Sequence, residues 1–69
     1  MSKFEIIIAS VPDRENVVAE IWHEQMMLAE VNNENGIFEV DLYPVEVTRI
    51  PLQAFLDALI DAQKLLSNS

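Results

Sequence analysis

The chain of 69 residues contains no cysteine, a single glycine and only three prolines. The absence of cysteine excludes disulfide bonds and thiolate metal sites. One glycine cannot supply a glycine-rich phosphate-binding loop, and the scarcity of glycine and proline argues against a disordered chain. Uninterrupted apolar runs are short, so we expect no segment to span a membrane. The expected class is therefore a small globular domain without a cofactor.

Positive charge is also scarce, because Lys and Arg number 4 whereas Asp and Glu number 12, giving a formal net charge of -8. Such a charge repels nucleic acid and anionic membranes and favours basic protein partners. Residues 1–5 lack the apolar core of a signal peptide, which makes a cytoplasmic location the expectation. The length allows one domain over residues 1–69, and a hydrophobic content of 51% is sufficient for a core.

Four segments have the composition of β-strands: residues 4–11, 17–23, 27–31 and 37–43. A proline follows the first and the last of these segments and ends each of them. Asn35-Gly36 is the strongest turn signal in the chain, because this pair favours positive φ in a hairpin. The fourth segment alternates strictly between apolar and other residues, as a half-buried strand does. Its apolar residues on one face are Phe38, Val40 and Leu42.

The periodicity changes after Pro51, where apolar residues recur at a spacing close to 3.6 and predict one amphipathic helix over residues 51–66. Pro51 suits the first turn of this helix. The expected apolar stripe consists of Leu52, Phe55, Leu56, Leu59, Ile60 and Leu66. We therefore predict an α+β fold, in which an antiparallel sheet of about four strands carries the C-terminal helix on one face, in the order β-β-β-β-α. Residues 46–49 form either a short additional strand or an extended link.

Two hairpins join the last three predicted strands, and each can be registered in two ways. At Asn35-Gly36 a two-residue turn places Val31 opposite Val40, whereas a four-residue loop places Val31 opposite Phe38. Both registers keep the same residues on the core face. For the earlier hairpin we favour a three-residue loop over residues 24–26. A two-residue turn would direct Glu20 towards the core, where an unpaired carboxylate costs several kcal/mol.

A single helix can cover only one face of the sheet. The residues expected beneath it are Phe4, Ile6, Ile8, Val17, Ala19, Ile21, His23, Met27, Ala29, Val31, Phe38, Val40 and Leu42. The opposite face is expected to mix carboxylates with apolar residues, including Ile7, Val18 and Ile37, which suits neither bulk water nor a dry core. We predict that a partner covers part of it. The predicted partner-binding residues are Glu20, Trp22, Leu28, Glu30, Glu39, Asp41 and Tyr43.

None of the reactive residue types forms a recognisable catalytic set. His23 has no accompanying nucleophile, orienting acid or metal-ligand spacing, so we interpret it as a structural residue near a hairpin end. Glu30 could lie across from another carboxylate at about the separation found in glycosidases, but a chain this short has no second layer to form a cleft. We expect no enzyme activity, metal or cofactor. Trp22 either fills the sheet face or anchors a partner.

Two parts of the chain carry a family resemblance: the stretch from Ala29-Glu30 through Gly36 to Leu42-Tyr43-Pro44, and Pro51-Leu52 at the start of the terminal helix. Over about two thirds of its length the chain resembles short acidic bacterial proteins, mostly uncharacterised, some of which are immunity proteins that neutralise a toxin. The resemblance assigns no functional residue and implies an interaction protein.

Two functions follow as hypotheses. The first is a non-enzymatic module that masks a basic partner surface, such as the substrate site of a toxin nuclease. The second is a homodimeric structural or regulatory protein, because a domain of this size is marginally stable alone.

Overall fold

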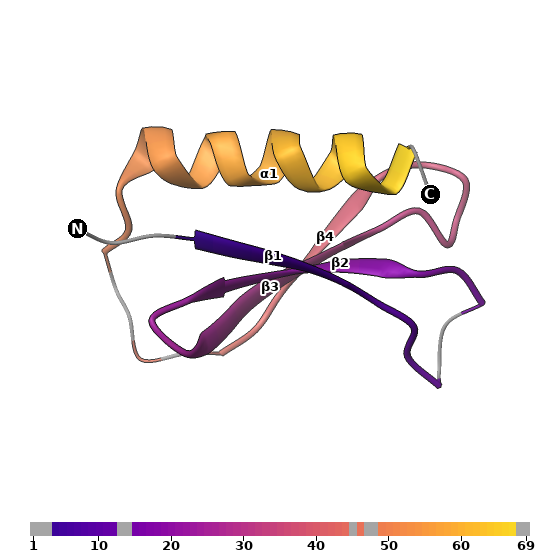
Figure 1. The fold of residues 1–69 in the computed structure, drawn as a ribbon, viewed down its shortest axis with the longest axis horizontal. Helices are drawn as coiled ribbons and strands as arrows, with labels where there is room; N and C mark the ends of the chain where they lie inside the picture. Colours follow the sequence, from indigo (N-terminus) through magenta and orange to yellow (C-terminus); the bar gives the residue numbers. More distant parts are fainter. Residues whose placement is uncertain (1–3, 13–14, 45, 47–48, 68–69) are drawn as a thin grey trace.

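The computed structural model describes residues 4–12, 15–44, 46 and 49–67, which form a sheet covered by one helix. The elements are β1 (Phe4–Ala9), β2 (Val18–His23), β3 (Met26–Asn32), β4 (Glu39–Leu42) and α1 (Leu52–Ser67). The sheet has the order β1-β2-β3-β4, and each strand pairs antiparallel with its neighbour in the chain. The helix lies on one face of this sheet (Figure 1). The predicted α+β fold is therefore confirmed.

The β3–β4 hairpin has the first of the two registers considered, because Val31 pairs with Val40. Its loop is wider than a two-residue turn, since the ladder starts at the pair formed by Asn32 and Glu39. Within the loop, Gly36 has a φ of 85° and its backbone N–H donates to the carbonyl oxygen of Asn33 at 3.1 Å. Positive φ is thus confined to the glycine, which adopts it without steric cost. β4 is consequently shorter than the predicted segment 37–43.

The β2–β3 hairpin has a two-residue turn, and the predicted three-residue loop is wrong. Glu24 and Gln25 adopt φ values of 49° and 69°, the left-handed pattern of a type I′ turn. Glu20 still points away from the helix, because the register shifts by one residue between Ile21 and Trp22. The β-bulge inserts one extra residue into β3, which has the same effect on the facing of Glu20 as the third residue of the predicted loop.

The bulge changes the positions of two β3 residues. Ile21 pairs with Ala29, whereas Trp22 pairs with Met27, so Leu28 is the extra residue between them. Leu28 is buried in the hydrophobic core beneath the helix, and its predicted place on the opposite face is wrong. Met27 lies opposite Trp22 and not on the core face where the alternation placed it.

The helix approaches the sheet through small residues. Ala58, Ala62 and Leu66 are buried in the core, and Phe55 and Leu59 pack against it. The predicted stripe is wrong in its other members, because Leu52, Leu56 and Ile60 are 72%, 40% and 49% exposed. Alanines on the sheet-facing line allow close packing, and the larger side chains of the apolar arc are displaced to one flank.

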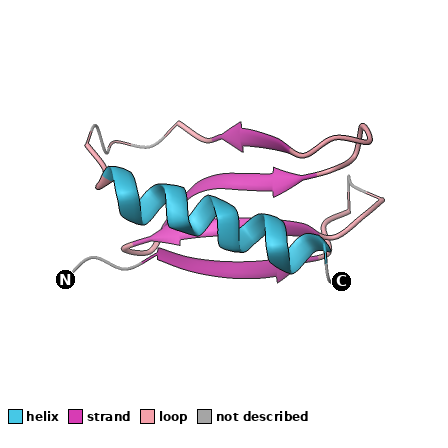
Figure 2. Cartoon of the chain, turned by 90° about the horizontal axis from the view of Figure 1, so that it is seen from above, coloured by secondary structure: helices cyan, strands magenta, loops and turns pink. Residues whose placement is uncertain are grey.

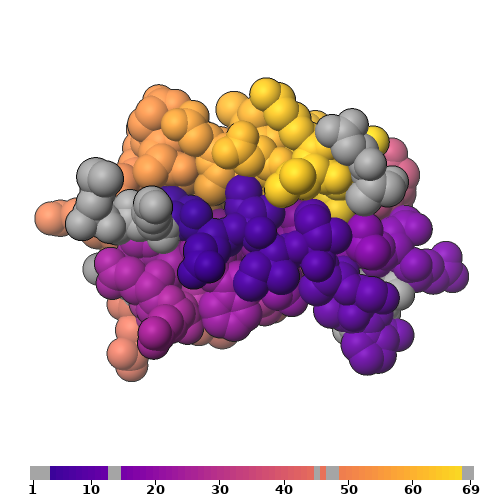
Figure 3. Space-filling model, in the orientation of Figure 1, coloured from indigo at the N-terminus to yellow at the C-terminus, as the bar shows by residue number. Residues whose placement is uncertain are grey.

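The helix covers only part of the sheet. Within the described residues it packs on β1, β2 and β3, whereas its backbone stays apart from that of β4. Figure 2 shows α1 crossing the first three strands and leaving β4 uncovered, and Figure 3 shows the surfaces of α1 and β1 adjoining. Phe38, Val40 and Leu42, predicted to lie in the core, are therefore 40%, 44% and 73% exposed.

The segment over residues 46–49 was predicted to be either a strand or a link. Residues 47 and 48 lie outside the described part of the chain, and neither Glu46 nor Arg49 belongs to a strand. Among the described strands, β1 and β4 form the two edges of the sheet.

Candidate functional site

The sheet segregates its charge to one face. Ile21 and Ala29 are buried beneath α1, so their chain neighbours Glu20, Trp22 and Glu30 project from the opposite side. The strand register adds three more carboxylates to this face. Glu5 pairs with Trp22, and Asp41 pairs with Glu30. Glu39 precedes Asp41 by two residues on β4 and therefore lies on the same side. All five carboxylates of the four described strands thus lie on the face away from α1, and within these strand ranges there is no Lys or Arg. We call this surface the acidic face; it comprises Glu5, Glu20, Trp22, Glu30, Glu39, Asp41 and Tyr43.

Glu30 occupies the middle of the acidic face and is only 4% exposed. The Tyr43 hydroxyl donates to its Oε1 at 3.0 Å, and the Asn32 amide Nδ2 donates to its Oε2 at 3.3 Å. The same amide donates to Oδ2 of Asp41 at 2.9 Å. These donors stabilise a carboxylate that burial would otherwise penalise. Glu30 therefore supplies negative charge from beneath the surface, whereas Glu5, Glu39 and Asp41 are exposed.

Trp22 lies beside Glu20 on β2 and is half-buried. Its indole Nε1 donates to Oε1 of Glu20 at 3.1 Å, which satisfies the one polar atom of the ring. A half-buried indole with a fixed orientation keeps part of its aromatic surface open to a partner. Tyr43 is also half-buried, with its hydroxyl held by Glu30.

The structure brings six of the seven predicted partner-binding residues to one face and removes Leu28 from it. Sequence reasoning overlooked Glu5 and the amide of Asn32. Glu5 could have been found, because the alternation that places its neighbours beneath the helix turns it to the other side. Among the other apolar residues assigned to this face, Val18 is fully buried, Ile7 is exposed, and Ile37 belongs to the β3–β4 loop.

His23 is a buried residue at the end of β2, as its structural interpretation implied. Its ring stacks on Phe4 with 4.6 Å between centroids, and its Nε2 lies 3.5 Å from Oε2 of Glu24. The described residues contain no group of three or more His, Cys, Asp or Glu side chains that could hold a metal ion.

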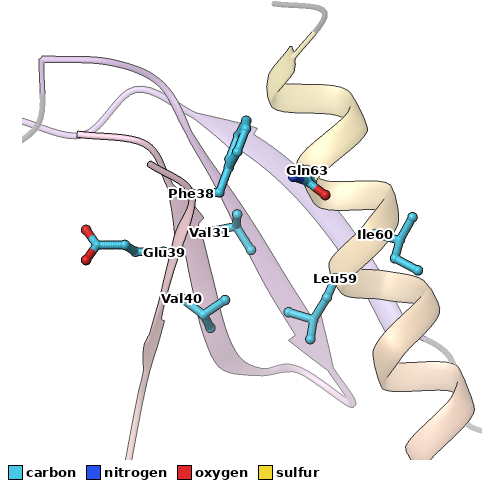
Figure 4. Close-up of a pocket in the computed structure, with 7 residues that line it drawn as sticks. All are labelled: Val31, Phe38, Glu39, Val40, Leu59, Ile60 and Gln63. Carbon is cyan, nitrogen blue, oxygen red and sulfur yellow. The ribbon is translucent and has the colours of Figure 1, made fainter. Parts of the chain in front are cut away.

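A shallow groove of about 190 Å³ separates α1 from β4. It is lined by Val31, Phe38, Glu39, Val40, Leu59, Ile60 and Gln63. Figure 4 shows the side chains of Val31, Val40 and Leu59 on the inner side of the groove, whereas Glu39 points away towards the acidic face. The volume is below the roughly 300 Å³ at which pockets for drug-sized ligands begin. Sequence reasoning missed this groove, because it assumed that the helix would cover the whole sheet face.

Comparisons of the chain with protein-family models, with curated proteins and with solved structures each found no match. Across the described ranges, no helix has the length and apolar character needed to cross a membrane. The acidic face and the groove are the two surface features of the described residues that suit a partner.

Proposed function

We propose that the protein is a non-catalytic binding module that masks a basic surface of another protein with its acidic face. The observation that carries the proposal is the placement of all five strand carboxylates on one face of a sheet whose described strands contain no Lys or Arg. Negative charge of this density attracts a basic partner over several ångströms and accelerates association.

The aromatic residues of the acidic face support a protein partner in particular. Trp22 and Tyr43 are each held in place by a hydrogen bond to a carboxylate and are partly open. Ordered aromatic side chains next to charged ones are typical of interface anchors. Nucleic acid and anionic membranes are unsuitable partners, because a net charge of -8 repels them. An enzyme that binds nucleic acid has the required basic surface, and an inhibitor or immunity protein for such an enzyme is the form of this function that the family resemblance implies.

The proposal is tested by reversing charge at two matched places. Glu5→Lys with Glu39→Lys changes two exposed positions of the acidic face, and Asp57→Lys with Asp61→Lys changes two exposed positions of α1. Both pairs alter the net charge equally. Immobilised proteins are used to capture partners from native lysate, and the captured proteins are quantified by mass spectrometry.

We expect the wild type and the α1 variant to retain the same basic proteins, and the acidic-face variant to lose them. Trp22→Ala should weaken their retention as well, because it removes the proposed anchor. Equal recovery of every protein by the acidic-face variant and the α1 variant would contradict the proposal.

Self-association is a second candidate function, favoured by the exposed apolar residues beside the groove. Phe38, Val40, Leu56 and Ile60 are all at least 40% exposed, and a second copy that covered them would add apolar burial to a small domain. Sedimentation velocity at micromolar concentration decides this candidate, since a stable monomer removes it.

A further inference from the structure

The free edge of β4 is the most open part of the sheet. All four of its residues are exposed, β3 is its only partner in the sheet, and α1 leaves its inner side uncovered among the described residues. The other edge, β1, lies against α1 and contains half-buried as well as exposed residues. An exposed edge strand with unpaired backbone groups is a template for another strand.

The backbone hydrogen bonds show which groups of β4 point outwards. The N–H of Tyr43 donates to the carbonyl oxygen of Leu28 at 3.0 Å, on the register that pairs Asp41 with Glu30. Inward and outward backbone groups alternate along an antiparallel strand. The N–H and C=O groups of Val40 and Leu42 are therefore directed away from β3, towards the free edge.

The side chains of β4 divide in the same way. Val40 lines the groove together with Leu59 and Ile60 of α1, and Leu42 lies on the same side of β4. Glu39 and Asp41 lie on the acidic face. A strand added at this edge would therefore have one row of side chains against an apolar groove and the other row beside carboxylates. Cross-strand neighbours are close enough for such apolar and opposite-charge pairs to be stabilising.

Building on the proposed function, we infer that β4 binds an extended segment of the partner as a fifth strand. In that segment Lys or Arg alternates with Val, Ile or Leu. The apolar residues of the segment lie opposite Val40 and Leu42 and complete the cover of the α1–β4 groove. Its basic residues lie beside Glu39 and Asp41. The apolar flank of α1, which includes Leu56 and Ile60, is then buried without any movement of the helix.

A second copy of this chain is a poorer occupant of the edge. Antiparallel pairing of two β4 strands would bring Glu39 and Asp41 of each copy next to those of the other, where like charges repel. Each copy also carries a net charge of -8. The negative charge beside the edge of β4 thus favours a basic segment over a second copy of this chain.

The test uses synthetic peptides with capped ends and about seven residues, the length of an ordinary strand. In the first peptide Lys alternates with Val. The second has the same composition with all lysines in one block, and the third is the first peptide methylated at the backbone nitrogens that would face β4. Binding to the isotope-labelled chain is followed by amide chemical shifts and by titration calorimetry at low salt.

A matched pair of variants removes the edge from the protein side. Val40→Pro deletes one outward N–H without disturbing a hydrogen bond to β3, and Val40→Ala trims the same side chain but keeps the N–H. We expect the alternating peptide to shift the amides of residues 38–43. We also expect methylation of the peptide or Val40→Pro to weaken its binding by about tenfold or more, and Val40→Ala by less. Should Val40→Pro fail to fold, the methylated peptide decides.

Each other outcome overturns the inference in a way that can be separated from failure of the proposed function. If the three peptides bind equally and the amide chemical-shift changes centre on Glu5 and Trp22, the peptides are attracted by charge alone. That result overturns the strand-addition inference and leaves the proposed function intact. Absence of binding by every peptide means that Glu39 and Asp41 only protect the edge from aggregation. Dimers of the free chain with shifts at Phe38 and Ile60 identify a second copy as the occupant. The proposed function fails only if the charge-reversal comparison fails.

Discussion

The Tyr43 hydroxyl lies 3.0 Å from Oε1 of Glu30 and connects the end of β4 to the middle of β3. Glu30 is nearly inaccessible to water, so this donor replaces hydration that the carboxylate lost on folding. Removing the donor would leave part of a buried charge without compensation, which costs more than the bond itself contributes. The pair therefore connects the stability of the edge strand to the charge of the acidic face.

Tyr43→Phe is expected to lower the free energy of unfolding by about 1–2 kcal/mol, because it deletes this hydrogen bond and keeps the ring. Urea denaturation followed by circular dichroism measures the change. Asn35→Ala serves as the control, since it removes the 2.9 Å bond between Asn35 Nδ2 and Glu39 Oε1 at an exposed site, where the loss should stay within about 0.5 kcal/mol. Equal losses in the two variants would show that Glu30 does not depend on Tyr43.

Gln25→Gly is expected to raise the free energy of unfolding by about 1 kcal/mol. Gln25 has a φ of 69°, which a residue with a Cβ adopts at a cost and glycine adopts freely. The same substitution at Lys64, an exposed helical position, should instead destabilise the protein by about 1 kcal/mol. Thermal and urea unfolding of both variants provide the comparison. Destabilisation by Gln25→Gly would argue that the turn is not left-handed at this residue.

Leu28→Ala and Met27→Ala test the position of the β-bulge. Leu28 is buried beneath α1, so its truncation is expected to cost about 2–4 kcal/mol through lost burial and the cavity left behind. Met27 is half-buried opposite Trp22, and its truncation should cost about half as much or less. A regular ladder without the bulge would reverse this order, since Met27 would then face the helix. Chemical denaturation of the two variants distinguishes the arrangements.

Ala62→Leu tests the close packing of α1 on the sheet. Ala62 has no exposed surface, so the added side chain must push the helix outwards or force strained rotamers, at an expected cost of about 1–3 kcal/mol. Asp61→Leu adds a similar side chain at the exposed neighbouring position and should change stability by at most about 0.5 kcal/mol. Similar melting temperatures for both variants would mean that the helix does not contact the sheet through its alanines.

The composition of four segments, the alternation over residues 37–43 and the 3.6-residue period after Pro51 were sufficient to predict the strands, the helix and most residues of the acidic face, although Glu5 was overlooked and Leu28 was wrongly included. They could not reveal the β-bulge, because a one-residue shift inside β3 leaves no compositional signal. The length of the β2–β3 turn was predicted wrongly for the same reason. Without the bulge, a two-residue turn would direct Glu20 into the core, so a three-residue loop was favoured. The bulge removes that conflict and places Leu28 in the core.

The orientation of the helix was also beyond the sequence pattern. The apolar arc of α1 is wider than the strip that touches the sheet, and side-chain size favoured its leucines over Ala58 and Ala62 as core residues. Packing favours the opposite choice, because small residues bring the two layers closer together. The uncovered β4 follows from this geometry, since one helix is about 10 Å wide and neighbouring strands are about 4.8 Å apart.

The simple sequential order of the strands has a consequence for how the chain folds. Each strand pairs with its neighbour in the chain, so the sheet can assemble from hairpins, and the packing of α1 on β1 and β2 joins the most distant parts of the described chain. Folding should therefore be fast, with helix docking as its latest event. During translation the apolar side of the sheet is synthesised before its cover, and mutual repulsion between the nascent acidic chains then limits their aggregation.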